Sequence, residues 1–278
     1  RCQGRGTECE SEGTPVGLIE AEWGMRHCDP VATPCGKPVE NRESGPGATG
    51  GAERKAMRPA DATLYRRAAA RTNYIALDRP DLSFASRVAS SSMSNPKEGD
   101  YQVIKRIIRY LQGKPRVAKR YQFQMESEGI TVYTDSDWAG YVETRKSTSG
   151  GVVCRGSHTI SWWCKLQSNV ELSSCEAELN AALKGAIERF NVQRVAATLG
   201  YYLSRALRTD ASASRGVLPR QRVGKVRHLQ VKQLWLQENV AAGERVMVKF
   251  PRDENCADAL THPWGVSDLP FWEIMGLH

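Results

Sequence analysis

The chain has 278 residues, of which 40% are hydrophobic and 25% charged, with a formal net charge of +8 and a pI of about 9.1. This length suffices for one or two domains with a buried core. No apolar run approaches the roughly 20 residues of a membrane span, and no signal peptide is visible, so we expect no membrane partner. The chain begins at Arg1 rather than Met, and we expect a fragment of a longer protein.

Basic residues gather in two stretches that contain no acid: seven in residues 101–120 and six in residues 211–237. Such blocks favour a polyanionic partner, most simply a nucleic-acid backbone, although two solvated faces are the alternative. The eight cysteines include no CxxC pair. We therefore expect reduced thiols of an intracellular protein rather than a zinc site.

The N-terminal part divides into two regions. Residues 1–60 are rich in Gly and Pro and are predicted to be poorly structured, apart from a short helix around residues 18–25. Residues 61–120 are predicted to be helical, with a break near Arg79-Pro80 and a new helix after Asn95-Pro96.

From residue 121 the pattern changes to short alternating strands and helices. We expect strands at 121–125, 129–134, 150–155, 159–163, 206–209 and 245–250, and helices after Ser173, at 226–242 and near Asn255. Ser173 and Glu176 form a capping box that starts the first of these helices. This order predicts a compact α/β domain over residues 121–264, followed by a tail, 265–278.

Four acidic residues stand at the ends of these elements. Asp135 and Asp210 each end a predicted strand, Glu178 borders an apolar helix stripe, and Asp258 lies in the first turn of a helix. Each alone has an ordinary alternative as a turn former, a salt-bridge residue or a helix cap. Together they suit two divalent cations and phosphodiester chemistry. Asp135 is preferred over Asp137 because the strand directs it.

Six motifs follow one another at specific spacings: YTDSDWAG from Tyr133, TRKSTSG from Thr144, ISW from Ile160, LSSCEAEL from Leu172, GKVRH from Gly224 and ENCADALT from Glu254. In these motifs residues 129–262 resemble the ribonuclease H domain of copia-type LTR retrotransposon Pol polyproteins. Upstream, residues 65–81, 93–96 and 107–111 resemble the segment that connects reverse transcriptase to ribonuclease H, and residues 24–34 resemble the end of reverse transcriptase.

This resemblance implies a ribonuclease-H-like fold, a five-stranded mixed sheet flanked by helices and preceded by a helical connection segment. It places Asp135, Glu178, Asp210 and Asp258 at the metal-binding, catalytic positions. Two Mg²⁺ ions, with Mn²⁺ as an alternative, would then support hydrolysis of the RNA strand of RNA–DNA hybrids. The implied partners are the hybrid and the rest of the Pol polyprotein. The implied location is the cytoplasm, in a retroelement particle, or the nucleus.

Candidate phosphate contacts are Arg145, Lys146, Lys225, Arg227 and His228. For His228, a place at a helix end is an equal alternative. The polymerase's paired-Asp motif is absent from the sequence, and so is a His in the loop before Asp258, which the copia-type pattern also lacks. A catalytically inactive nucleic-acid-binding remnant is the second hypothesis; the complete acid set argues against it. The acid contexts and the upstream match weaken a third, an integrase-type nuclease.

Overall fold

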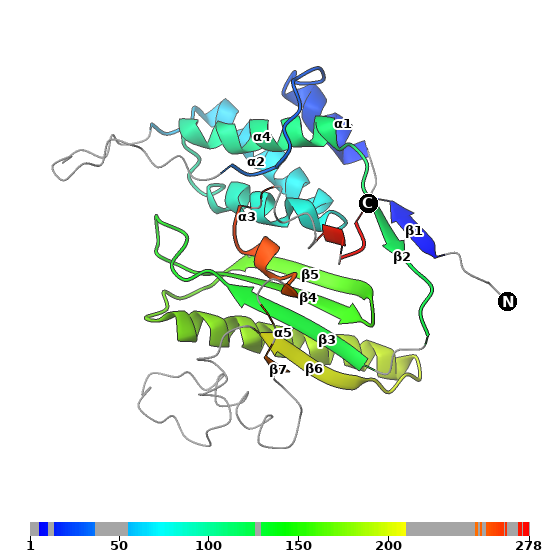
Figure 1. Cartoon of the computed structure of the whole chain (residues 1–278). Coiled ribbons are helices and arrows are strands. Elements are labelled where there is room, and N and C mark those ends of the chain that lie inside the picture. Colours follow the sequence, from blue (N-terminus) through cyan, green and yellow to red (C-terminus); the bar gives the residue numbers. More distant parts are fainter. Residues whose placement is uncertain are drawn as a thin grey trace. The chain divides into compact units, whose positions relative to one another are not determined.

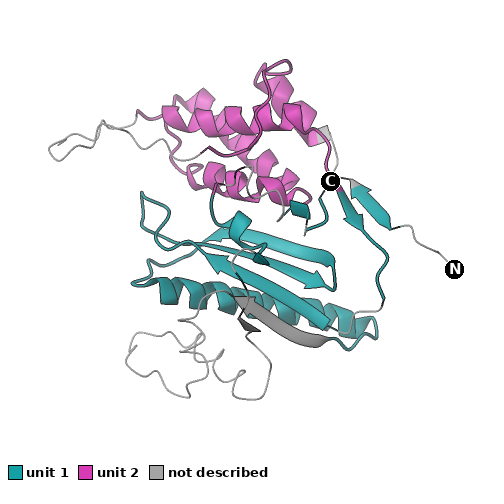
Figure 2. Ribbon diagram, viewed as in Figure 1, with its two compact units in different colours: residues 1–9, 119–262, 268–278 teal, residues 10–118, 263–267 magenta. Residues whose placement is uncertain are grey.

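The computed structural model describes residues 6–10, 14–36, 55–125, 129–209, 248–249, 251, 254–263, 265, 272–273 and 275–277. These residues fall into two compact units, which Figure 2 distinguishes by colour. One unit, here called the sheet unit, comprises Arg1–Cys9, Lys119–His262 and Asp268–His278. The other, the helical unit, comprises Glu10–Ala118 and Pro263–Ser267.

The sheet unit is built on a five-stranded mixed sheet with the strand order β5-β4-β3-β6-β7 (Figure 1). Its strands are β3 (Gly129–Ser136), β4 (Thr148–Arg155), β5 (His158–Leu166), β6 (Ser204–Thr209) and β7 (Val248–Lys249). Strand β3 pairs antiparallel with β4 and parallel with β6, β4 pairs antiparallel with β5, and β6 pairs parallel with β7. This topology confirms the predicted ribonuclease-H-like fold with a five-stranded mixed sheet.

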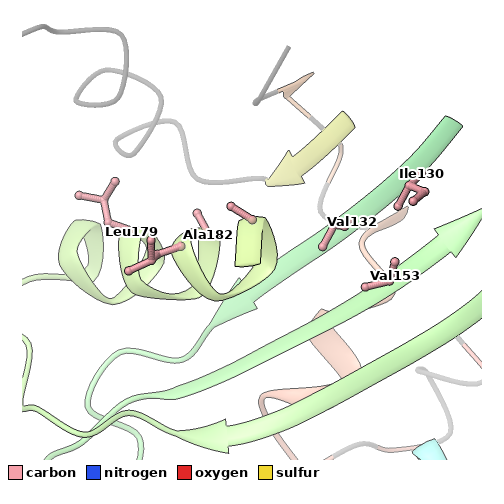
Figure 3. Close-up of a cluster of buried hydrophobic side chains, with 7 residues drawn as sticks. Ile130, Val132, Val153, Leu179 and Ala182 are labelled. Carbon is pink, nitrogen blue, oxygen red and sulfur yellow. The ribbon is translucent and has the colours of Figure 1, made fainter. Parts of the chain in front are cut away.

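Helix α5 (Ser174–Thr198) packs on β3 and β4. Alternate residues of β3 are buried, which brings Ile130 and Val132 together on one face. Figure 3 shows them to the side of Leu179 and Ala182, helix residues of the same buried cluster. Each fully buried Val, Ile or Leu side chain contributes about 1.5–3 kcal/mol. The period of two in the strand and the helical spacing in α5 therefore meet in one core, as the sequence pattern predicted.

The helical unit contains four α-helices among its described residues. They are α1 (Thr14–Glu22), α2 (Pro59–Ile75), α3 (Ser83–Ser91) and α4 (Tyr101–Gly113), with short 3₁₀ turns η1 (Pro80–Leu82) and η2 (Glu98–Asp100) before α3 and α4. The break predicted at Arg79-Pro80 is confirmed, because Pro80 opens η1 rather than continuing α2. None of the described helices is long and apolar enough to cross a membrane.

The strand predicted at residues 121–125 is wrong. The observed strand is β2 (Ala118–Tyr121), which pairs with β1 (Thr7–Glu10) in a separate two-stranded sheet. The alternating apolar residues that suggested the longer strand are not buried against a neighbouring surface, since Phe123 is 67% and Met125 83% exposed. The last predicted helix, near Asn255, is a single 3₁₀ turn, η4 (Asp258–Leu260).

Candidate active site at the end of strand β3

Asp135 is the penultimate residue of the central strand. It pairs with Gly150 of β4 and alternates with the neighbours that face α5. Its residue exposure is only 7%. Asp137, two residues on, has a different use: its Oδ1 accepts the Thr148 amide and its own amide donates to the Thr148 carbonyl, which closes the β3–β4 loop. Because β3 ends at Ser136, Asp137 lies beyond the strand, and its contacts with Thr148 give it surroundings of its own.

The segment 255–262 docks at this end of β3. The side-chain amide of Asn255 donates to the Thr134 carbonyl oxygen at 3.2 Å. The Thr261 hydroxyl donates to the Asp135 carboxylate and lies 2.9 Å from the Asp258 carbonyl oxygen. Asp258 opens η4, and its Oδ2 lies 3.6 Å from His262 Nδ1. Two predicted ligands far apart in the chain are thus linked through one threonine.

Gly150 makes the close docking of this segment sterically feasible. A Cβ at this position would lie 2.8 Å from Thr261 Cγ2, 2.9 Å from the Ala257 carbonyl oxygen and 3.0 Å from Leu260 Cβ. Contacts that short force the neighbouring atoms to move, and two of these three lie on or next to the backbone. A residue without a side chain is therefore required directly opposite Asp135.

Helix α5 begins after Ser173 as predicted, but of the predicted capping box only the Ser173 half is present, because Glu176 binds the amide of Leu172 instead of that of Ser173. The Ser173 hydroxyl accepts the Glu176 amide at 3.3 Å, and the Glu176 carboxylate accepts the Leu172 amide at 2.8 Å. The buried Glu176 is thereby engaged at the helix start. Glu178 is half-buried and precedes the core residue Leu179. In Figure 3 Leu179 lies toward the tip of the β3 arrow and Ile130 toward its start.

Burial also affects the thiols near these acids. Burial raises the pKa of the Cys175 thiol, and the neighbouring charges of Glu176 and Glu178 raise it further. Burial raises the pKa of Cys256 well above its ordinary value, with Cys154 adding to the effect. Both thiols are thus held in the protonated form, which suits packing rather than metal ligation or nucleophilic chemistry.

Asp210, Lys225, Arg227 and His228 lie outside the described residues, so the structure places three of the four predicted ligands. Those three are all carboxylates, the hard oxygen donors that Mg²⁺ and Mn²⁺ prefer, and in donor chemistry they fit such an ion. Within the described part of the chain, no three His, Cys, Asp or Glu residues gather closely enough to hold a metal ion. The structure links Asp135 to the Asp258 segment through Thr261, and Glu178 lies near the start of α5, the helix that packs on β3.

The loop between β3 and β4 carries candidate nucleic-acid contacts. Arg145 is exposed at positive φ (56°) and Lys146 is half-buried, paired across the loop with Tyr141. Trp138, three residues after Asp135, is 55% exposed, yet its indole Nε1 donates to the Glu171 carbonyl oxygen at 3.2 Å. This hydrogen bond holds an exposed indole in place in the β3–β4 loop.

Much of the basic stretch 101–120 is engaged within the protein. Arg106 donates to the Thr33 carbonyl and hydroxyl oxygens, and Arg109 donates to the Asp29 carbonyl oxygen. The Lys119 ammonium lies over the Trp162 ring at 4.6 Å. The lack of acids in this stretch suggested that its positive charge faces outward. Part of that charge is instead bound within the protein, because backbone carbonyls and aromatic rings also bind cations.

Three features of the site had not been assigned a role from sequence: Thr261, Gly150 and Trp138. Thr261 and Trp138 lie inside the motifs around Asp258 and Asp135, so their spacing from the acids was the available signal. Gly150 had no comparable signal, because a glycine that ends a motif is usually explained by a turn or bulge.

Comparison with known proteins supplies relatives for most of the chain. No protein-family model matches it. It is 30% identical to the retrovirus-related Pol polyprotein from transposon RE1 of Arabidopsis thaliana over 206 residues. These residues cover 73% of this chain and 14% of that protein. It is 31% identical over 204 residues to the Pol polyprotein from transposon TNT 1-94 of Nicotiana tabacum, 72% of this chain and 15% of that protein.

The chain thus spans about one seventh of the length of these two relatives. Among solved structures, LC11-RNase H1, isolated from compost by a metagenomic approach, is 20% identical with a TM-score of 0.34. That similarity covers 48% of this chain and 92% of the other.

Proposed function

This chain is homologous to the retrovirus-related Pol polyproteins of copia-type transposons over about three quarters of its length, and we propose that its sheet unit is a ribonuclease H. The reaction is endonucleolytic hydrolysis of the RNA strand of an RNA–DNA hybrid during reverse transcription. Its partners are the hybrid and the rest of the Pol polyprotein, including reverse transcriptase. The observation that supports the proposal is the pair of hydrogen bonds by which Thr261 joins Asp135 on β3 to the segment that carries Asp258.

In this proposal Asp135, Glu178, Asp210 and Asp258 hold two Mg²⁺ ions, or Mn²⁺. When bound, such ions lower the pKa of a water molecule and stabilise charge on the leaving oxygen. The chain's own part is to supply anionic oxygens on elements that are packed or hydrogen-bonded to one another. Strand β3 and helix α5 share a packed core, and the 255–262 segment is hydrogen-bonded to β3 at Thr134 and Asp135.

The proposed hybrid contacts come from two stretches of the chain. Arg145 and Lys146 would bind phosphates from the β3–β4 loop, and Lys225, Arg227 and His228 from the stretch outside the described residues. Trp138 would stack against a sugar or base. Selectivity for RNA would come from contacts with 2′-hydroxyls in the wide minor groove.

The test is cleavage of a labelled RNA–DNA hybrid by the purified chain in Mg²⁺ or Mn²⁺, beside Asp135→Asn. We expect cuts in the RNA strand only, none in a DNA duplex of the same sequence, and at least about a hundredfold loss in the variant, because a metal ligand contributes several kcal/mol to transition-state stabilisation. Asp78→Asn, which changes an exposed acid of the helical unit, serves as the matched control and should cleave as the unchanged chain does.

Two results would contradict the enzyme hypothesis. Cleavage that is equal in the unchanged chain and Asp135→Asn would show a contaminating nuclease. Salt-sensitive hybrid binding without cleavage would favour a catalytically inactive nucleic-acid-binding remnant of a retroelement.

A further inference from the structure

We propose that Thr261 is a positioning residue, which orients the Asp135 carboxylate and fixes the Asp258 segment against it for cation binding. The inference rests on the proposed function, because it assigns Asp135 and Asp258 to the metal site. It adds a role for a side chain that ligates nothing itself.

The first observation is the contact between Thr261 and Asp135. The two residues are 126 positions apart in the chain and are 2% and 7% exposed. The Thr261 hydroxyl donates to Asp135 Oδ2 and also lies within hydrogen-bonding distance of the Asp258 carbonyl. One small side chain therefore contacts both the strand and the segment that carry the predicted ligands.

The second observation is the chemistry of the donor. A hydroxyl fixes the rotation of a carboxylate without cancelling its negative charge, whereas a lysine or arginine in the same place would compete with a cation. Hydrogen-bond partners of this kind orient metal ligands, and their removal typically costs about 10–100-fold in metal affinity or activity. Threonine is also β-branched, so its preferred rotamers are few and its hydroxyl is held in place.

The third observation is the steric fit around this contact. Gly150, opposite Asp135, leaves room for Thr261 Cγ2 and the Ala257 carbonyl, which an added Cβ would approach to 2.8 and 2.9 Å. The other hydrogen bond that anchors the segment, from Asn255 to the Thr134 carbonyl, reaches the backbone and no carboxylate. Orientation of Asp135 can therefore be separated from docking of the segment by mutation.

The test is isothermal titration calorimetry of the full chain with Mn²⁺ alone. The melting temperature of each variant in the presence of a chelator measures whether it is folded. We expect Thr261→Val to weaken Mn²⁺ binding about 10–100-fold. Thr261→Ser, which keeps the hydroxyl, should restore most of the affinity. Asn255→Ala is the matched comparison: it should lower the melting temperature in chelator and weaken Mn²⁺ binding less than Thr261→Val does.

Unchanged Mn²⁺ affinity in Thr261→Val would overturn the inference, and so would a Thr261→Ser variant as weak as Thr261→Val, since packing of the methyl group would then be the cause. If Thr261→Val does not fold, Gly150→Ala carries the test, because it keeps the hydroxyl but displaces the segment; full Mn²⁺ affinity in that variant would overturn the inference. Failure of the unchanged chain to bind Mn²⁺ would instead refute the metal site of the proposed function, and the inference with it.

Discussion

Two buried aspartates, one in each unit, accept hydrogen bonds from donors of different charge. In the helical unit Asp81 is 3% exposed and Arg79 is fully buried. The Arg79 guanidinium donates to both Asp81 oxygens, from Nε at 2.9 Å and from Nη2 at 2.7 Å, and the Tyr110 hydroxyl adds a further bond at 2.7 Å. In the sheet unit Asp135 is 7% exposed and accepts the neutral hydroxyl of Thr261.

The difference shows that burial by itself does not identify a functional acid. The Arg79–Asp81 pair is bidentate and charge-compensated, which ties the helices of its unit together and leaves the carboxylate committed to that pair. The Thr261 contact orients the Asp135 carboxylate and leaves its charge uncancelled by that bond. Partner chemistry therefore separates the structural aspartate from the candidate ligand.

The largest expected effect on stability is a difference between two single variants, in which Asn replaces Asp81 or Asp135. Asp81→Asn leaves Arg79 buried with its charge uncompensated, and we expect the free energy of unfolding of the helical unit to fall by about 3–5 kcal/mol. Asp135→Asn keeps an oxygen that can accept from Thr261, so the sheet unit should change by less than about 1 kcal/mol. Urea denaturation followed by circular dichroism, fitted with one transition per unit, measures both.

Asp78→Asn, at an exposed position of the helical unit, is the control and should stay within about 0.5 kcal/mol. Equal losses at Asp81 and Asp135 would remove the distinction between the two aspartates.

A smaller effect is expected at the start of α5, where the Glu178 turn is held by local contacts. Ser173→Ala removes the hydroxyl that accepts the Glu176 amide and should lower the free energy of unfolding of the sheet unit by about 1 kcal/mol. Ser174→Ala, at the exposed first helical residue, should be close to neutral. The same urea measurement tests both, and an equal loss in the two variants would show that the cap contributes nothing specific.

The smallest effect concerns alkaline pH. Burial raises the pKa of Cys256 well above its ordinary value of 9.0, and burial together with Asp81 raises that of Tyr110 above its ordinary value of 10.0. The Cys256 thiol ionises near pH 9 in the unfolded chain but stays protonated in the folded one. Its contribution to the free energy of unfolding is therefore complete below pH 9 and is lost as pH rises toward the folded pKa. For each such group the free energy of unfolding falls by at most about 1.4 kcal/mol per pH unit.

We therefore expect the sheet unit to lose stability from about pH 9 and the helical unit from about pH 10, in urea titrations at increasing pH. Cys256→Ala and Tyr110→Phe should each flatten the slope of their own unit. An unaltered slope in both variants would assign the alkaline loss to other groups.

Local features of the sequence predicted much of the fold. Pro80 opened η1 after the end of α2, Ser173 and Glu176 started α5, and alternation in residues 129–134 predicted β3 with Asp135 at its end. Each of these signals acts within one or two turns of chain, where backbone sterics and capping dominate. The strand predicted at 121–125 failed because alternation produces a strand only when a neighbouring surface buries one of its faces.

The sequence by itself thus determined most of the described elements of the sheet unit and the position of Asp135 at the end of β3, since strand period and helix caps are set by nearby residues. Tertiary structure alone decided what surrounds that aspartate. The Thr261–Asp135 contact spans 126 residues, and the need for glycine at position 150 arises only where η4 reaches β4. The physical reason is that a hydrogen bond or steric fit between distant segments depends on their packing, and no local propensity encodes it.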